Sequence, residues 1–304
     1  LLGRNTSQDV LSLCAQQRVT MQYITNISAV CHSYATLNSG AQCPGFALSR
    51  FTLLAESCRG YDLCFSIDFR DVVFQGNPFA SLRTRHGQRR RRGSDPSSRT
   101  MILSEEAASK NMQTSFFNAQ WASTCYGKAS HNGVFRRRPI INSGSIFASS
   151  EGFEAIADAL SNPSRCPATN TSNFHGVDQV ILNWMAYSGH LEQRGFLVDI
   201  QPRGQGVVNT LRYTLGPLRT KTIKSANGSK LGMVWQHPLA ADALLSTENW
   251  PKAPPFTVYN DDGSVSPVLH QYDSVPHLQR SLDRAALSYI SEHFPGRALA
   301  APHQ

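Results

Sequence analysis

The sequence predicts an α/β protein with a mostly parallel central sheet flanked by helices. Through roughly the first seventy residues, apolar runs of strand length alternate with segments whose apolar residues recur at helical spacing. This order is typical of parallel sheets, because two parallel strands need a long and usually helical connection. With 40% hydrophobic and 16% charged residues and no internal repeat, the composition is that of a globular chain. We therefore expect one domain over residues 1–304, with its first strand truncated.

The elements of the first part follow from apolar spacing and from glycine. A helical pattern stops before Gly60, because glycine readily adopts the conformation that ends helices. The run YDLCFSI that follows is continuously apolar, which is the pattern of a strand buried on both faces. In order, we expect the tail of a strand at Leu1–Gly3, a helix capped by Ser7, and a short strand at Val19–Ile24. A helix at Phe46–Cys58 and a strand at Tyr61–Ile67 follow.

The rest of the chain continues the alternation. Residues Phe256–Tyr259 and Val265–His270 flank an Asp262-Gly263 turn signal, which predicts a β-hairpin. The region Pro202–Pro238 has no clear pattern. The remaining expected elements, in chain order, are a strand at Met101–Leu103, a helix at Ser115–Cys125, a strand at Pro139–Ala148, helices at Gly152–Leu160 and Val177–Tyr187, a strand at Phe196–Ile200 and an amphipathic helix at Leu278–Phe294.

The formal charge of +8 is concentrated in one segment, the run Arg83–Arg99 with four consecutive arginines at Arg89–Arg92. Glycine, serine, aspartate and proline surround these arginines, so residues 83–100 are expected to be a solvated, mobile loop insertion. The alternative is a docking site for an acidic partner or acceptor. No aromatic residues are interleaved to stack on bases, so we expect no nucleic-acid partner.

Cysteines and sequons indicate the compartment. Four acceptor sequences for N-glycosylation begin at Asn5, Asn26, Asn170 and Asn227. The seven cysteines form no CxxC pair and no zinc spacing. Cys31, Cys43 and Cys58 are candidates for disulfides in an oxidising lumen, whereas Cys64 within an apolar strand is expected to be core. No apolar stretch approaches bilayer length, and the chain begins at Leu1 without a leader, so we interpret it as a fragment whose targeting segment has been removed.

The strongest local signal for chemistry is Asp68 and Asp71, directly after the buried strand. Ligands of open parallel sheets bind outside the carboxyl ends of the strands, where these acids would lie. On the turn leaving the strand, both carboxylates could point at one hard cation such as Mg²⁺ or Mn²⁺. The alternative, equally compatible with the spacing, is a salt-bridged turn in which Arg70 pairs with an acid.

Four segments in order resemble the nucleotide-diphospho-sugar transferases of the GT-A fold. Their residues are Asp68–Gln75 with Asn77–Phe79, Asn142–Gly144, His175–Gln179 with Asn183, and His270–Asp273. The first is similar to the D-x-R-D-V-x-F-Q-x-x-P-F metal motif of a eukaryotic branch. The resemblance implies a single Rossmann-like GT-A domain. It also implies a metal held by Asp71, Asp68 and His270, a donor sugar lined by Asn142 and Gly144, and a reacting carbon near Asp178 and Gln179.

The same resemblance implies a metal-dependent glycosyltransferase. It would use Mn²⁺ or Mg²⁺ to move a sugar from a nucleotide diphosphate donor to a glycan, glycoprotein or glycolipid acceptor. Glycogenin-like families combine the same motifs, which favours retention. The expected location is the Golgi lumen of a type II membrane protein, anchored through a segment absent from this fragment. The alternative is a catalytically silent nucleotide-sugar or glycan-binding module.

Three further charged residues have two interpretations each. Arg50, on the helix before the motif strand, could reach the diphosphate or be a solvated helix charge. Glu105 and Glu106 are candidates for acceptor or base contacts and, equally, for surface acids.

Overall fold

The computed structural model describes residues 46–68, 71–80, 82, 99–106, 110–162, 166, 176–211, 219–224, 230–236, 256–260, 264–272 and 279. Several expectations lie outside these residues. They are the elements before Phe46, the basic run 83–98, the four sequons, residues Cys14, Cys31 and Cys43, and the C-terminal helix apart from Gln279.

The described helices and strands alternate along the chain. In order they are α3 (Phe46–Ser57), β1 (Cys64–Ile67), β2 (Val72–Phe74), β3 (Thr100–Glu105), α5 (Phe116–Tyr126), the 3₁₀ helix η1 (Lys128–His131), β4 (Ile141–Ala148), α6 (Ser150–Ser161), α7 (Val177–Tyr187), α8 (His190–Gln193), β5 (Leu197–Gln201), β6 (Val208–Thr210), β7 (Arg219–Lys224), β8 (Lys230–Gln236), β9 (Phe256–Tyr259) and β10 (Val268–His270).

The main sheet has four strands in the order β1-β4-β3-β5. β1 and β3 both run antiparallel to β4, and β5 runs parallel to β3. The expected α/β class is confirmed, but a mostly parallel sheet is wrong for the described strands, because β4 is inserted in the opposite direction between two strands that share one direction. The inversion brings the amino end of β4 next to the carboxyl ends of β1 and β3, as the pairs Ile67–Ser145 and Glu105–Ile141 show. We call this edge the site edge.

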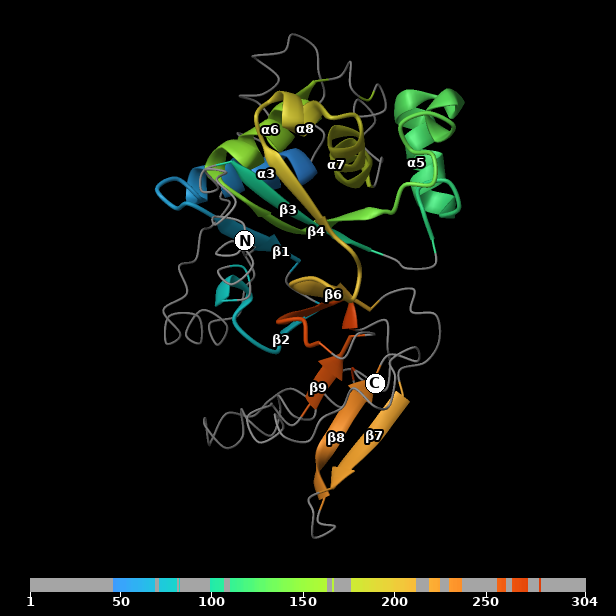
Figure 1. The fold of residues 1–304 in the computed structure, drawn as a ribbon. Helices are drawn as coiled ribbons and strands as arrows, with labels where there is room; N and C mark the ends of the chain where they lie inside the picture. The colour runs from blue at the N-terminus through green and yellow to red at the C-terminus, as the bar shows by residue number, and fades with distance from the viewer. Residues whose placement is uncertain are drawn as a thin grey trace.

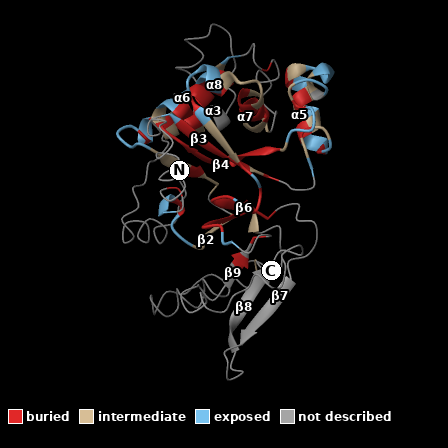
Figure 2. Ribbon diagram, viewed as in Figure 1, coloured by how far each residue is buried: buried red, intermediate tan, exposed pale blue. Residues whose placement is uncertain are grey.

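Helices cover one face of the main sheet (Figure 1). Met101 and Leu103 of β3 pack into the same buried cluster as α3, α6 and α7, whereas Ile102 between them packs on the other face. This alternation follows from the two-residue period of a strand. Burial is greatest in the two central strands, β3 and β4, and on the helix sides that face them, whereas the outer strands β1 and β5 are mostly intermediate (Figure 2).

The other face is covered by a small sheet in the order β2-β10-β6. β10 lies in its centre, antiparallel to β2 and parallel to β6. The small sheet contributes Val208 and Val268 to a cluster with the main-sheet residues Ile102 and Phe147. Both sheets are therefore anchored to one another through buried aliphatic and aromatic side chains.

The hairpin expected near the C-terminal end does not form. β9 pairs with β8 in a third sheet, β7-β8-β9, while β10 belongs to the small sheet. The residues on either side of the expected turn still meet, since the amide of Asn260 donates to the carbonyl oxygen of Ser264 at 2.8 Å. The Asp262-Gly263 turn itself lies outside the described residues, and the strands on its two sides pair with different partners.

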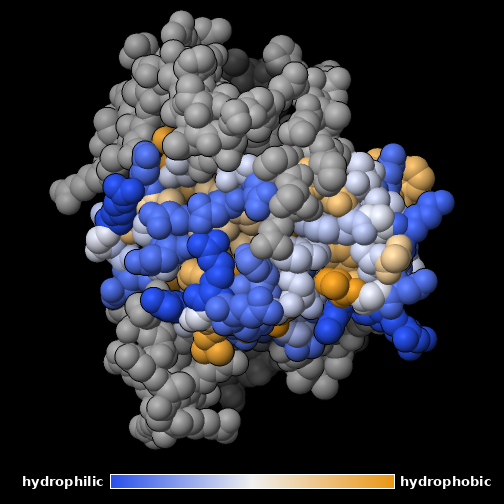
Figure 3. Space-filling model, turned by 90° about the horizontal axis from the view of Figure 1, so that it is seen from above, coloured by the Kyte–Doolittle hydropathy of each residue, from blue (hydrophilic) through white to orange (hydrophobic). Residues whose placement is uncertain are grey.

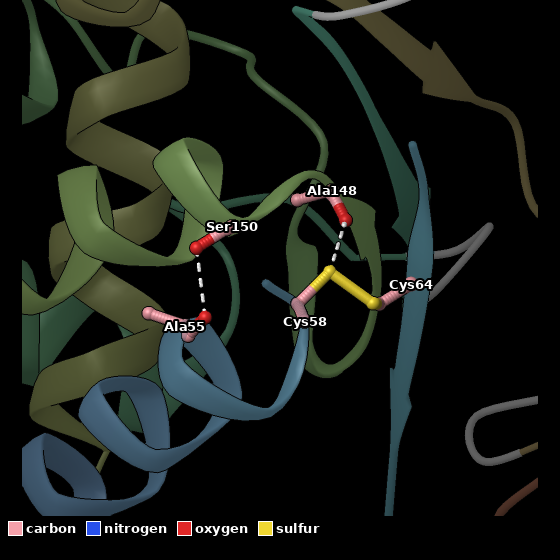
Figure 4. Close-up of a disulfide and its surroundings, with 5 residues drawn as sticks. All are labelled: Ala55, Cys58, Cys64, Ala148 and Ser150. Carbon is pink, nitrogen blue, oxygen red and sulfur yellow. Dashed lines mark hydrogen bonds between the residues drawn. A yellow bond between two sulfur atoms is a disulfide. The ribbon is translucent and has the colours of Figure 1, made fainter. Parts of the chain in front are cut away.

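Two disulfides join described residues. Cys58–Cys64 links the end of α3 to the start of β1, and Cys125–Cys166 links α5 to the segment after α6. In Figure 4, Sγ of Cys58 also lies beside the carbonyl oxygen of Ala148, at 3.7 Å. The expectation that Cys64 is plain core is wrong, because the tight connection from α3 to β1 brings it next to Cys58.

The two disulfides indicate the kind of cellular compartment in which the protein folds. Such bonds persist in oxidising environments, so the structure is consistent with an extracellular or secretory-pathway domain. Among the described helices, none combines the length and apolar character required to cross a bilayer.

Candidate metal centre

Asp68 is held at the site edge by the backbone of β4. Its amide donates to the carbonyl oxygen of Gly144 at 2.8 Å, directly beyond the last residue of β1. A Cβ on Gly144 would collide with the Asp68 carboxylate, so this side chain can lie where it does only beside a glycine. The glycine of the N-x-G segment therefore fixes the first carboxylate.

His270 reaches the same place from the small sheet. It is the last residue of β10 and pairs with Val72 of β2, next to Asp71. Beyond this pair, the amide of Tyr272 donates to the carbonyl oxygen of Asp71 at 3.4 Å. The antiparallel pairing of β2 with β10 thus places the histidine beside the second carboxylate.

The three side chains converge on one point. Nε2 of His270 lies 3.4 Å from Oδ2 of Asp68 and 3.9 Å from Oδ1 of Asp71. One ligand atom from each residue falls within 4.8 Å of the others. The imidazole is completely buried, whereas the Asp71 and Asp68 side chains are 15% and 41% exposed. The cluster is therefore open to solvent on the Asp68 side.

The donor set fits a divalent cation. Neither ring nitrogen of His270 has a hydrogen-bond partner among the described residues, although buried polar atoms are nearly always paired. Two carboxylate oxygens and one imidazole nitrogen suit Mn²⁺, and Mg²⁺ less well because it prefers oxygen alone. A cation between the three groups would satisfy the orphaned nitrogen and offset the two negative charges.

Arg50 joins the metal candidates to the predicted catalytic acid. Its guanidinium group donates to Oδ1 of Asp68 at 3.2 Å, to Oδ2 of Asp178 at 2.9 Å and to the carbonyl oxygen of Ser143 at 3.0 Å. The interpretation as a solvated helix charge is wrong, because α3 points this side chain into the site edge, where it is mostly buried. Its predicted contact with a diphosphate stays a prediction.

Gln179, on the first turn of α7, is the centre of a second polar network. Its side-chain NH₂ donates to Glu106 at 2.9 Å and to Asn118 at 3.0 Å, and its carbonyl oxygen accepts from the amide of Ser143 at 3.4 Å. One turn further along α7, Asn183 bonds both the amide and the carbonyl of Ile141, at 2.9 and 2.8 Å. Two amide side chains four residues apart therefore dock α7 onto the inverted strand β4.

The two glutamates after β3 differ in environment. Glu106 is buried and bonded to Gln179, so it belongs to the site network rather than to the surface. Glu105 accepts from the amide of Arg203 at 3.3 Å. Burial raises the pKa of the Glu105 carboxyl above its usual range, and this hydrogen bond offsets the increase in part.

The predicted donor-lining residues also lie at the site edge. The side-chain oxygen of Asn142 accepts from the amide of Gly144 at 2.6 Å, within a strand buried along its whole length. The structure thus brings together all the predicted site residues: Arg50, Asp68, Asp71, Asn142, Gly144, Asp178, Gln179 and His270. His175 and Asp273 lie outside the described residues.

Two residues of the site were not anticipated. Asn118 of α5 contacts Gln179, yet nothing in the local pattern of α5 distinguishes it from a polar surface position. Gln75, at the end of the Asp68–Gln75 segment, bonds the amide of Val258 at 2.6 Å and the carbonyl of Ser266 at 2.9 Å. The glutamine thus anchors the motif segment to the C-terminal part of the chain.

Comparison with known proteins identifies no family or relative for this chain. No protein-family model matches the chain, and no match to a curated protein was found.

Proposed function

We propose that this chain is a metal-dependent glycosyltransferase that uses a nucleotide diphosphate sugar as donor. The observation that carries the proposal is the convergence of Asp68, Asp71 and His270, with the buried imidazole nitrogens lacking hydrogen-bond partners among the described residues. A second observation supports the proposal without the motif resemblance. Asp68 follows β1 of the main sheet, whereas Asp71 directly precedes β2 and His270 ends β10, both strands of the small sheet. A salt-bridged turn between Asp68 and Asp71 would not require a histidine from β10.

Asp71, Asp68 and His270 would hold the cation. When bound, such a cation neutralises negative charge on a leaving diphosphate by Lewis-acid chemistry. Arg50 supplies a second positive charge close to the cluster, and by pairing with Asp178 it holds that carboxylate in place. Gln179 is fixed by three hydrogen-bond partners and gives the donor-binding region a rigid polar wall.

The sugar would lie between the cluster and the start of α7, since Asn142–Gly144 and Asp178–Gln179 meet there. The Asp178 carboxylate then faces the sugar, where it favours an oxocarbenium-like transition state electrostatically. We propose retention of configuration, as the resemblance to glycogenin-like families implies.

We also propose that the domain is of the GT-A type and that it lies in the Golgi lumen. Three of the four main strands share one direction, so their carboxyl ends gather at the site edge, as a GT-A-type nucleotide-binding domain requires. The disulfides support a luminal enzyme, which we propose acts in the Golgi as part of a type II membrane protein.

Thermal unfolding in the presence of UDP or GDP, each with and without Mn²⁺, tests the proposal. A nucleotide should raise the melting temperature only with the metal, because Asp68 and Asp71 alone would repel the diphosphate and a bound cation would offset their charge. Asp71→Asn and His270→Gln should abolish the shift, whereas Asp158→Asn, which alters an exposed acid of α6, should retain it. Absence of any shift with either nucleotide under every metal condition contradicts the proposal. Hydrolysis of a panel of nucleotide sugars then identifies the donor.

A further inference from the structure

Helix α5 carries two large apolar side chains that do not pack into the protein core. Asn118, Ala122 and Cys125 form its buried side. The side chains of Phe116 and Phe117 are instead 75% and 53% exposed. Exposed aromatic residues that lie together on a folded domain commonly mark a site for a ligand, a protein partner or a membrane.

The exposed rings contact one another. Phe116 and Phe117 meet edge to face with centroids 5.4 Å apart, and Phe117 stacks on Trp121 at 6.0 Å. We call Phe116, Phe117 and Trp121 the aromatic platform. Figure 3 looks down on the helices and shows a mostly hydrophilic face, with hydrophobic side chains among charged ones along the side where Figure 1 places α5. Phe116 and Phe117 therefore form exposed apolar surface on α5, with Trp121 partly buried beside them.

The platform is directly continuous with the candidate site. Asn118, which follows Phe117, accepts from Gln179 at 3.0 Å. Trp121 lies against Gly176, two residues before Asp178, so closely that a Cβ on this glycine would collide with the indole ring. Helix α5 thus has one side in the polar network and carries aromatic rings at the adjacent surface.

We propose that the aromatic platform binds a sugar ring of the acceptor, so that the acceptor of this enzyme is a carbohydrate. This inference rests on the proposed transferase function. The C–H face of a pyranose is apolar and stacks on aromatic rings, while its hydroxyl groups bond polar side chains at the rim. The platform offers the rings, and the partly exposed carboxylate of Asp178, two residues after the glycine that Trp121 contacts, offers a hydrogen-bond acceptor beside them. A lipid bilayer or a second copy of the chain would use the rings but would gain nothing from their position beside Asp178.

Binding of the whole chain to an array of immobilised oligosaccharides, with UDP or GDP and Mn²⁺ present, tests the proposal. The variants are Phe116→Ala/Phe117→Ala and Phe117→Tyr, which keeps a ring. The matched control is Tyr61→Ala, because Tyr61 is 68% exposed but precedes β1, at the end opposite Asp68. We expect the double variant to lose about tenfold or more in glycan affinity, with Phe117→Tyr and Tyr61→Ala retaining binding. The metal-dependent nucleotide shift should be the same in all of them.

The outcomes separate this proposal from the transferase function. If the nucleotide shift is intact but the chain binds no glycan, or binds it equally well in the double variant, the platform proposal is overturned. Loss of self-association or of binding to phosphatidylcholine vesicles in the double variant, with glycan binding unchanged, overturns it in favour of a second copy or a membrane. Platform-dependent glycan binding without any nucleotide shift supports the platform and contradicts the transferase.

Discussion

Arg50 and Asp178 form a partly buried ion pair, with an N–O distance of 2.9 Å, between the first described helix and the start of α7. The same guanidinium group also pairs with Asp68, so the Arg50 side chain aligns a predicted metal ligand with a predicted catalytic acid. Arg50 reaches its acceptors from two different nitrogens of a planar fork, whereas the donors of a lysine all radiate from one nitrogen and cannot match these positions.

Arg50→Lys should therefore destabilise the protein by about 1–3 kcal/mol, because at least one partly buried carboxylate loses its partner. Urea unfolding monitored by tryptophan fluorescence measures the change. Arg194→Lys is the control, since Arg194 pairs with Asp158 at the surface, where such pairs contribute up to about 1 kcal/mol. Equal effects of the two substitutions would show that the Arg50 pairs are not structural.

Gly144→Ala should disturb the site through a direct collision with the Asp68 carboxylate. We expect a destabilisation of about 1–3 kcal/mol, typical of overpacking, together with loss of the Mn²⁺-dependent nucleotide shift. Chemical unfolding and the thermal shift measure the two effects. In Gly133→Ala the new methyl group would meet its nearest neighbour at an ordinary 3.6 Å, so this control should change neither quantity substantially.

Glu105→Gln should stabilise the protein increasingly as the pH rises from about 4 to about 7. The pKa of Glu105 is raised in the folded state, so the folded chain binds this proton more tightly than the unfolded chain. The stability that this bound proton contributes is present at low pH and is lost as the pH rises through the folded pKa, where the partly buried carboxylate must ionise. Glutamine keeps an acceptor for the Arg203 amide but carries no charge.

The measurement for Glu105 is the difference in unfolding free energy between variant and wild type at both pH values. Glu154→Gln, at an exposed position of α6, measures the general effect of removing one negative charge. A difference for Glu105→Gln that falls with pH would contradict the raised pKa.

The two disulfides should contribute unequally. Cys125 and Cys166 are 41 residues apart, whereas Cys58 and Cys64 are only 6 apart. A longer closed loop restricts the unfolded chain more, so Cys125→Ala/Cys166→Ala should cost about 1–2 kcal/mol more than Cys58→Ala/Cys64→Ala. Denaturation of both double variants under identical conditions tests this order. The opposite order would place the main contribution of the short disulfide in the folded state.

Local patterns predicted the elements well and their pairing poorly. The α7 bounds Val177–Tyr187 and the strand that ends at Ala148 follow from spacing alone, because periodicity reports which faces are buried. The direction of β4 leaves no such trace, since the burial pattern of a strand is the same whichever way the strand runs. The Asp-Gly signal likewise predicted a hairpin, but nothing in the spacing shows that β9 pairs with β8 and that Val268 packs with Val208.

The site was predictable only where its residues form a motif. The resemblance predicted that Asp68, Asp71 and His270 meet, and one ligand atom of each does lie within 4.8 Å of the others. The ion pair of Arg50 with Asp178 and the contact of Asn118 with Gln179 join distant parts of the chain through single side chains. Spacing in one sequence contains no record of such contacts.

The pairing of β2 with β10 has a consequence for folding. It is the step that carries His270 to Asp71, and it joins segments near opposite ends of the described chain. Contacts so far apart in sequence form only after the intervening chain is ordered, because loop closure must precede them. Tight binding of a cation should then appear late during refolding, when β2 and β10 have paired. A chain released before His270 would hold the two aspartates without their histidine, so metal affinity reports whether these two distant segments have come together.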